Sequence, residues 1–269
     1  MNIQDTAAIR SASLIGEPIV RKEDGTLLRG QGRYTDDISL PNQAHAYILR
    51  SSVAHGRIKS INTDAARKMK GVLAIYTGED LKPYGTIQSA LPFKSRDGSD
   101  MKKPGRPMLP TDKVRFVGDP IACVVAETVL QAKDAAEAIE LDIEPLPVVV
   151  DFTKADAKGA PAVFDDIPDN VSLDYHYGDT EKVSAAFAGA AHKVKLKMLN
   201  SRLVVNSMEP RSAIADYDTA EEHFTLYTTS QNPHVARLVL SAFYNIAPEH
   251  KLRVIAPDVG AIHSRRFGG

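Results

Sequence analysis

The stretch of residues 121–150 is the part of this 269-residue chain that most restricts its fold. It begins with the apolar run IACVVAE, continues with TVLQAKDAAEAIE and ends with LDIEPLPVVVD. The first and last runs are typical of strands, whereas the middle run predicts a helix capped by Thr128, with Gln131 as its capping-box partner. The apolar residues at helical spacing are Val129, Ala132, Ala136 and Ile139. A strand–helix–strand unit of this kind predicts an α+β or α/β fold.

The first globular segment continues this mixture of short strands and helices toward the N-terminus. We expect it to cover residues 20–150, after an N-terminal extension of residues 1–19. Strands are expected in QAHAYILRSS and GVLAIYT, and short helices in NTDAARKM and GEDL. Residues 85–112 are rich in Pro, Gly, Ser and Lys, which predicts a long excursion.

A second segment is expected over residues 179–269, beyond a connector of residues 151–178. The connector has no sustained period, so we expect it to cross the surface in extended form. Asp179 is expected to cap the helix TEKVSAAFAGA. The run HKVKLKML alternates lysine with apolar residues, which predicts a half-buried strand. Further strands are expected in SAIADYD, HFTLYTTS and KLRVIAPDVG, and HVARLVLSAFYNI has the spacing of an amphipathic helix.

Charge and cysteine content exclude several classes of function. The net charge of −1 provides no basic face for nucleic acid. The single cysteine, Cys123, lies in a strand-like run and is expected to be a small buried apolar residue. One cysteine excludes an internal disulfide and fits a reducing compartment. The N-terminus does not resemble a signal peptide, and no run approaches the roughly 18 apolar residues of a membrane span, so a cytoplasmic protein is expected.

Common catalytic and metal-binding motifs are absent from the chain. There is no phosphate loop, no G-x-G-x-x-G after a strand, no G-x-S-x-G and no His-Glu-x-x-His. The eight histidines are scattered, and solvated or capping roles are expected for them. The residues alone therefore assign no catalytic group and no metal ligand.

The stretch TTSQNPHVARLV contains the one candidate binding residue that the pattern suggests. A strand ends there, a Gln-Asn-Pro turn follows, and a helix begins. Pro233 suits the first turn of a helix, and Asn232 suits its cap. Gln231 then lies between a strand end and a helix N-terminus, where polar groups converge on ligands. The residues alone leave open whether Gln231 binds a ligand or only shapes the turn.

Six blocks in order along the chain resemble one enzyme family. They are GEPIVRKEDGTLLRGQGRYTDDI, AYILRSSVAHGRIKSIN, VRFVGDPIACVVAET, NSMEPRSAIADYD, TTSQNPHVAR and KLRVIAPDVG. Together they are similar to the large, molybdopterin-binding subunit of the xanthine dehydrogenase, aldehyde oxidase and carbon monoxide dehydrogenase family of molybdenum hydroxylases. The resemblance covers residues 14–260.

This resemblance implies an α+β fold with two parts. Residues 20–150 would form an a/b hammerhead domain, and residues 179–269 the first, incomplete part of a molybdopterin-binding domain. The implied reaction is oxidative hydroxylation of an aldehyde, an N-heterocycle or carbon monoxide. The implied cofactor is molybdopterin, and the implied partners are iron–sulfur and FAD subunits or domains.

The resemblance also implies cofactor-binding residues. In the family, the glutamine matched by Gln231 forms a hydrogen bond near the apical oxygen of molybdenum. A Gly-Gly-Gly-Phe-Gly loop approaches the cofactor with its backbone; Gly260 matches its first position. Phe267 and Gly268 resemble its end, but the stretch AIHSRR stands between them and Gly260. Glu209, in the Met-Glu-Pro-Arg block, is expected to be mainly structural.

The family's catalytic glutamate lies in a region for which this chain has no counterpart, so no catalytic residue is assigned. We therefore expect the chain alone to be inactive and not to hold the cofactor, and the missing C-terminal part of the large subunit is an expected partner. Two alternatives remain open: a non-catalytic truncated or split-gene protein that assembles with a separate cofactor-binding chain, and an α+β binding module without metal.

Overall fold

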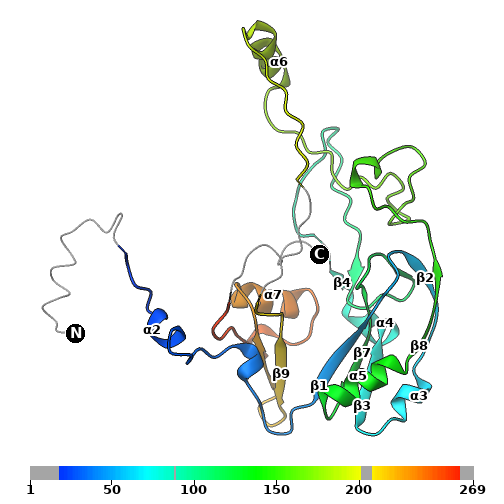
Figure 1. The fold of residues 1–269 in the computed structure, drawn as a ribbon, viewed down its shortest axis with the longest axis vertical. Helices are drawn as coiled ribbons and strands as arrows, with labels where there is room; N and C mark the ends of the chain where they lie inside the picture. Colours follow the sequence, from blue (N-terminus) through cyan, green and yellow to red (C-terminus); the bar gives the residue numbers. More distant parts are fainter. Residues whose placement is uncertain (1–17, 88, 201–207, 261–269) are drawn as a thin grey trace, which may run out of the picture. The chain divides into compact units, whose positions relative to one another are not determined.

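The computed structural model describes residues 18–87, 89–200 and 208–260 (Figure 1). The chain contains mixed helices and strands, as expected for an α+β protein. No helix in these three ranges is long and apolar enough to cross a membrane.

The chain divides by its contacts into two compact units. The larger unit consists of the described residues between 39 and 200 and of residues 234–252. The smaller unit consists of the described residues before Ser39, those between 208 and 233, and those from Arg253 on. Residues 20–38 therefore group with the later sheet, whereas the predicted boundary assigned them to the first segment. The predicted domain boundaries stay predictions.

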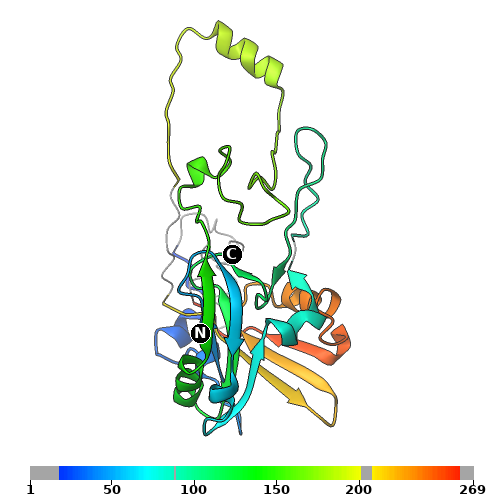
Figure 2. The same ribbon diagram turned by 90° about the vertical axis from the view of Figure 1, so that its right-hand side faces the viewer.

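A three-stranded antiparallel sheet forms the centre of the larger unit (Figure 2). Its middle strand is β7 (Pro120–Ala126), which pairs with β1 (His45–Arg50) and β3 (Val72–Thr77). Helix α5 (Val129–Glu137) packs against β1 and β7, and α3 (Asp64–Arg67) against β3. The core between them consists largely of alanine, valine and isoleucine, with Ile75 and Val124 among the most buried residues. Small side chains let the helix approach the sheet closely, at the packing density of a protein interior.

Helix α5 begins as predicted. The Thr128 hydroxyl accepts a hydrogen bond from the Gln131 backbone N–H at 3.2 Å. Of the residues predicted to face the core, Ala132, Ala136 and Ile139 are buried, but Val129 is 45% exposed. The buried stripe of the helix instead includes Ala135 and starts one turn later than predicted.

A second sheet of the larger unit contains two strands that the sequence pattern did not predict. Its order is β6 (Lys113–Val114), β2 (Gly56–Asn62) and β8 (Glu140–Pro145), all antiparallel. The unpredicted strands are the two-residue β6 and the longer β2, in which Ile58 and Ile61 are both half-buried although they are three residues apart. The pairing register with β8 shifts between Ile58 and Ser60. Because of this bulge, both isoleucines can lie on the same face of the sheet despite their odd spacing.

Shorter elements complete the larger unit. They are α4 (Gly78–Leu81), η2 (Lys82–Tyr84), the strand pair β4 (Thr86–Ile87) and β5 (Arg106–Pro107), η3 (Phe152–Lys154), α6 (Thr180–Gly189), α7 (Pro233–Ala242), which starts at the boundary between the units, and η4 (Glu249–Lys251). The predicted helices at GEDL, TEKVSAAFAGA and HVARLVLSAFYNI are confirmed. Asp179 caps α6 as predicted, accepting from the Lys182 N–H at 3.0 Å.

The predicted connector, residues 151–178, folds back on itself, so the prediction of an extended crossing is wrong. Asn170 has a left-handed φ of 56° and donates its amide N–H groups to the carbonyls of Ala155 and Pro161. Asparagine tolerates this backbone region better than most residues, and its side chain ties the loop together. Ile167 is buried inside the loop, with 4% exposure.

The same loop is fastened to the second sheet by an ion pair. The Lys113 ammonium is buried and donates to both carboxylate oxygens of Asp165, at 2.7 and 2.6 Å. This hydrogen bond and charge hold the pKa of Asp165 below its usual value. In the same loop, the ring centre of Phe164, the residue before Asp165, lies 4.8 Å from the Arg115 guanidinium. A carboxylate here neutralises a lysine that would otherwise be an unpaired buried charge.

The run HKVKLKML does not form the predicted strand. Residues 193–200 have no strand neighbour within the described chain, and the apolar side chains are exposed: Val194 by 91%, Leu196 by 74% and Met198 by 80%. An alternating pattern produces a half-buried strand only where another strand provides its hydrogen bonds.

The smaller unit is built on a third sheet, of order β11 (Leu252–Ile255), β10 (His223–Thr228) and β9 (Ala213–Asp218). These strands confirm the predictions for KLRVIAPDVG, HFTLYTTS and SAIADYD. β9 and β10 form an antiparallel hairpin, and the rings of Tyr217 and Phe224 lie 4.4 Å apart across it. The turn η1 (Thr35–Asp37) contacts β9, and α2 (Asp24–Leu27) precedes it in the chain.

Candidate functional site

The candidate site lies where the chain leaves the carboxyl ends of β10 and β11. Glu209, just before β9, accepts hydrogen bonds with both carboxylate oxygens: one from the Thr229 hydroxyl at 3.1 Å and one from the Gly260 N–H. Thr229 follows β10 directly, and Gly260 follows β11 by five residues. The two strand exits therefore meet at one carboxylate, at the same edge of the sheet.

Two hydrogen bonds to the residue before β9 fix the chain where it leaves the C-terminal end of β10, here called the β10 exit. The Thr229 N–H donates to the Ser212 carbonyl at 3.3 Å, and the Thr228 hydroxyl donates to the same carbonyl at 3.1 Å. Gln231, the predicted cofactor residue, lies only two residues after Thr229 and is exposed.

Gly260 lacks a side chain for a reason that the structure makes visible. A Cβ atom at this position would lie 2.9 Å from Glu209 Oε2 and 3.0 Å from Glu209 Cβ. Any larger residue would therefore displace the carboxylate that accepts the Gly260 N–H. The mainly structural role predicted for Glu209 agrees with these contacts.

A second pair of bonds fixes the turn that leads to Gly260. The Arg33 N–H donates to Asp258 Oδ2 at 2.7 Å, and the Asp258 N–H donates to the Arg33 carbonyl at 3.1 Å. Because 225 positions separate these residues in the sequence, the turn is held by a distant part of the chain rather than by local structure alone.

The remaining predicted residues are placed as follows. Pro233 is the first residue of α7, as predicted, and the Asn232 N–H donates to Ser230 Oγ at 3.2 Å. Phe267 and Gly268 lie outside the described residues. Within the described ranges, no group of three or more His, Cys, Asp or Glu side chains is arranged to hold a metal ion. His55, predicted to be solvated or capping, is instead buried, with Nδ1 2.8 Å from the Pro147 carbonyl.

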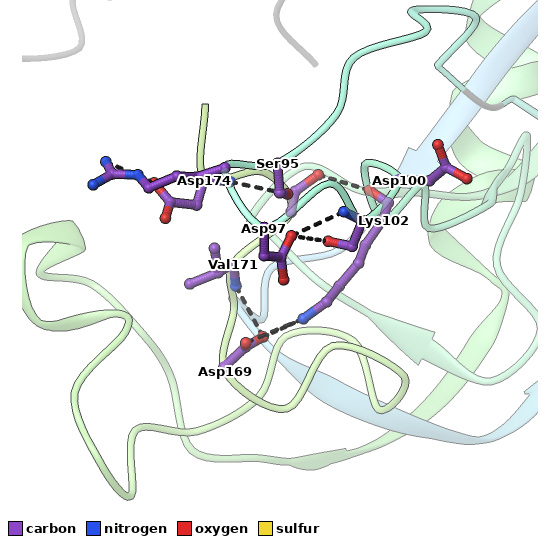
Figure 3. A pocket seen from close by; sticks show the side chains of 10 residues that line it. Ser95, Asp97, Asp100, Lys102, Asp169, Val171 and Asp174 are labelled. Atoms are coloured by element: carbon purple, nitrogen blue, oxygen red, sulfur yellow. Dashed lines mark hydrogen bonds and ion pairs between the residues drawn. The ribbon is translucent and has the colours of Figure 1, made fainter. Parts of the chain in front are cut away.

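An open polar pocket of about 450 Å³ lies elsewhere, in the larger unit, between residues 95–102 and 169–174 (Figure 3). Its carboxylates already have partners: Asp97 accepts from the Ser99 N–H and hydroxyl, and Asp169 accepts from the Lys102 ammonium. These bonds lower the pKa values of Asp97 and Asp169. Carboxylates stabilised in the charged form do not suit general acid catalysis, so we assign no chemistry to this pocket.

Two groups with raised pKa values also have structural explanations. Burial raises the pKa of Asp119, which accepts the Arg115 N–H at 2.9 Å in the turn before β7. Burial likewise raises the pKa of the Cys123 thiol, which is half-buried in β7. A raised pKa reduces the fraction of reactive thiolate. Cys123 is therefore less buried than the sequence predicted, although its raised pKa agrees with an unreactive thiol.

Two domain families match the sequence of this chain. Residues 29–147 match the a/b hammerhead domain of aldehyde oxidase and xanthine dehydrogenase, and residues 163–262 match the molybdopterin cofactor-binding domain. The chain is 35% identical to the nicotine 6-hydroxylase large subunit of Paenarthrobacter nicotinovorans, over 92% of this chain and 30% of that protein. It is 36% identical to the carbon monoxide dehydrogenase large chain of Afipia carboxidovorans, over 100% of this chain and 34% of that one. The chain belongs to the family of molybdenum hydroxylase large subunits.

Solved structures agree with this molybdenum hydroxylase fold. The crystal structure of a Cu,Mo-containing carbon monoxide dehydrogenase superposes with a TM-score of 0.78 at 35% identity, covering 94% of this chain and 32% of that one. A quinoline 2-oxidoreductase from Pseudomonas putida gives the same TM-score at 31% identity and covers 91% of this chain. The predicted fold class, a hammerhead domain followed by part of a molybdopterin-binding domain, is confirmed. The chain spans about a third of the length of these relatives.

The carboxylate of Glu209 offers a direct test of the candidate site in this molybdenum hydroxylase chain. Glu209→Ala removes the acceptor of both the Thr229 hydroxyl and the Gly260 N–H. We expect a loss of about 1–3 kcal/mol in the free energy of unfolding of the smaller unit, because each half-buried donor loses its partner. Urea denaturation monitored by hydrogen exchange in β9 and β10 measures it.

The control is Asp216→Ala, which removes an exposed carboxylate of β9. It should change the same free energy by less than about 0.5 kcal/mol. Equal losses in the two variants would show that Glu209 does not join the strand exits.

Proposed function

We propose that this chain is the N-terminal portion of a molybdenum hydroxylase large subunit whose intact enzyme performs oxidative hydroxylation of an aldehyde, an N-heterocycle or carbon monoxide. Both family domains follow each other in one chain, and relatives that match it are named for nicotine and carbon monoxide. The observation that carries the proposal is the meeting of the two strand exits at Glu209. It brings the segments that contain Gln231 and Gly260 to one edge of a sheet, and both residues belong to the predicted cofactor set.

The residues at this edge fit a molybdopterin cofactor. Gln231 is exposed at a strand exit and carries an amide that can donate to an oxygen ligand. The Gly260 N–H is taken by Glu209, which also fills the place that a Cβ of Gly260 would occupy, so Gly260 would contribute the course of its backbone rather than a hydrogen bond. Phe267 and Gly268 are proposed to complete the contact. When bound, the cofactor supplies the redox chemistry, and the protein residues orient it and its substrate.

Assembly with further polypeptide is part of the proposal. Because the chain spans about a third of its relatives, we propose that it does not hold the cofactor alone and requires the remaining part of a large subunit. Iron–sulfur and FAD subunits or domains would then transfer electrons, in the cytoplasm. A second candidate function is that of a non-catalytic protein that assembles with a separate cofactor-binding chain.

The test is co-expression of the full chain with the C-terminal two thirds of the Afipia carboxidovorans carbon monoxide dehydrogenase large chain, in a host that makes the cofactor. We expect purified complex to contain molybdenum and, after oxidation, pterin fluorescence, whereas the chain purified alone contains neither. A complex without molybdenum or pterin would favour the non-catalytic partner. No complex and no metal would leave the α+β binding module.

A further inference from the structure

The short segment from Asp258 to Gly260 is bound at both of its ends. At one end, the Gly260 N–H donates to the Glu209 carboxylate. At the other end, the Arg33 N–H donates to Asp258 Oδ2 at 2.7 Å, and the Asp258 N–H donates to the Arg33 carbonyl at 3.1 Å. Arg33 and Asp258 are therefore joined in both directions, and this reciprocal pair is here called the Arg33–Asp258 clasp.

The N-terminal side of the clasp is supported by contacts of its own. Helix α2 ends at Gly30, which has a left-handed φ of 67° and whose N–H donates to the Leu27 carbonyl at 3.1 Å. A Cβ atom at Gly32 would lie 2.8 Å from Leu27 Cδ2, so this leucine packs against the glycine backbone. Arg33 thus extends from a short ordered segment that fixes where its backbone N–H and carbonyl lie.

Sequence matching assigns the two halves of the clasp to different domains. Arg33 falls within the hammerhead match, residues 29–147, whereas Asp258 falls within the molybdopterin-binding match, residues 163–262. By their contacts, however, both residues belong to the smaller unit, together with Glu209. Residues 29–33 therefore group with the cofactor-binding half of the chain, although the family match counts them in the hammerhead domain.

The clasp bears on the backbone that the cofactor would approach. Gly260 lies two residues beyond Asp258, a span of at most about 7 Å, so a shift of Asp258 is passed on to Gly260. In the proposed cofactor site, Gly260 contributes the course of its backbone. Contacts that orient the ligands of a bound metal change its affinity by roughly 10–100-fold, even though they do not touch the metal.

We propose that Asp258 is a positioning residue of the cofactor site, and that residues 29–33 take part in this site through the clasp. Asp258 acts through Gly260 and does not itself contact the cofactor. The inference rests on the proposed function, which supplies the cofactor, but the clasp itself is testable in the chain alone.

The first test uses the full chain without cofactor. Asp258→Ala removes the acceptor of the Arg33 N–H, whereas Asp258→Asn keeps a side-chain oxygen that accepts it. Hydrogen exchange at Arg33 and Gly260, measured by NMR, should become about tenfold faster in the alanine variant, because a lost hydrogen bond makes local opening easier. The asparagine variant should exchange within about threefold of the unchanged chain.

Arg33 provides a matched pair of variants from the other side of the clasp. Because the bond uses the backbone N–H, Arg33→Ala keeps it and should leave the exchange at Gly260 unchanged. Arg33→Pro removes the donor and should accelerate exchange at Gly260 as Asp258→Ala does. The double variant Asp258→Ala with Arg33→Pro should have no larger effect than either change alone, since both delete the same bond.

The second test measures molybdenum in the complex with the C-terminal two thirds of the Afipia carboxidovorans large chain, co-expressed in a host that makes the cofactor. Asp258→Ala should lower the molybdenum content per complex by about tenfold, and Asp258→Asn should restore it. The control is Tyr217→Ala, which removes the ring contact with Phe224 in the same unit. It should lower the melting temperature of the smaller unit and leave the molybdenum content unchanged.

The outcomes separate the positioning role from the proposed function. Full molybdenum in the Asp258→Ala complex would overturn the positioning role alone, and so would equal losses in Asp258→Ala and Tyr217→Ala, which would reduce Asp258 to a stability residue. Exchange at Gly260 that Asp258→Ala leaves unaltered would show that the clasp does not set this backbone. A complex of the unchanged chain without molybdenum would overturn the proposed function and the positioning role together.

Discussion

Replacing Val124 by aspartate is expected to abolish cooperative folding of the larger unit. Val124 lies in β7, the middle strand of its sheet, is fully buried, and faces the core formed with α5. A carboxyl group there has no partner, and burying it costs several kcal/mol, roughly the 5–15 kcal/mol by which a whole domain is stable. Circular dichroism during heating should show a broad, featureless change in place of one sharp transition.

Leu130→Asp is the control for this variant. Leu130 is in α5, six residues further along, but is 71% exposed. The same chemical change there should lower the free energy of unfolding by less than about 1 kcal/mol. If Val124→Asp melted as sharply as Leu130→Asp, the sheet order with β7 in the middle would be wrong.

The elements that the sequence predicted correctly are those whose cause is local. Strand β7, helix α5 and the Thr128 cap follow one another within a short stretch, and each depends on residues close in sequence. Strand β2 was missed because its bulge breaks the two-residue period: Ile58 and Ile61 share one sheet face at a spacing of three. A sequence pattern cannot show a bulge, since the bulge is defined by the partner strand.

Two predictions failed because tertiary contacts decided the outcome. Residues 151–178 were expected to be extended, but Asn170 closes them into a loop and Asp165 joins that loop to Lys113, more than fifty positions earlier. Residues 193–198 were expected to be half-buried, yet the described chain provides no strand beside them. In both cases the local pattern does not show which distant residues provide the contacts.

The candidate site was predictable in part. Gln231 and Gly260 were named by resemblance, and their role as cofactor residues stays a prediction; the strands that precede them were predicted by their apolar pattern. The contact that joins the two exits was not predicted, because Glu209, Thr229 and Gly260 are separated by 20 and 51 positions. The available signal was a glutamate next to a proline just before a strand, which indicated structure but not its hydrogen-bond partners.

Gln231→Ala is expected to have its large effect on turnover and not on stability. In the chain alone, Gln231 is exposed, so the free energy of unfolding should change by less than about 0.5 kcal/mol. In the assembled large subunit, the proposed role of its amide is to donate to an oxygen ligand of the cofactor. Removing such a donor from a water-poor site costs about 2–4 kcal/mol of transition-state stabilisation, a loss of tens-fold or more in kcat.

Three measurements separate a cofactor contact from a turn residue at Gln231. Molybdenum content must be determined for each variant, because lost turnover counts only if the cofactor is retained. Gln31→Ala, which changes another exposed glutamine of the smaller unit, should retain full turnover. Gln231→Glu keeps the shape of the side chain but removes the donor, so it should lose turnover as alanine does.

A large stability loss in the chain alone would make Gln231 a residue that shapes the turn before α7. Unchanged turnover with full molybdenum would remove Gln231 from the cofactor site, and the β10 exit would then serve only to hold the sheet edge together through Thr229 and Glu209.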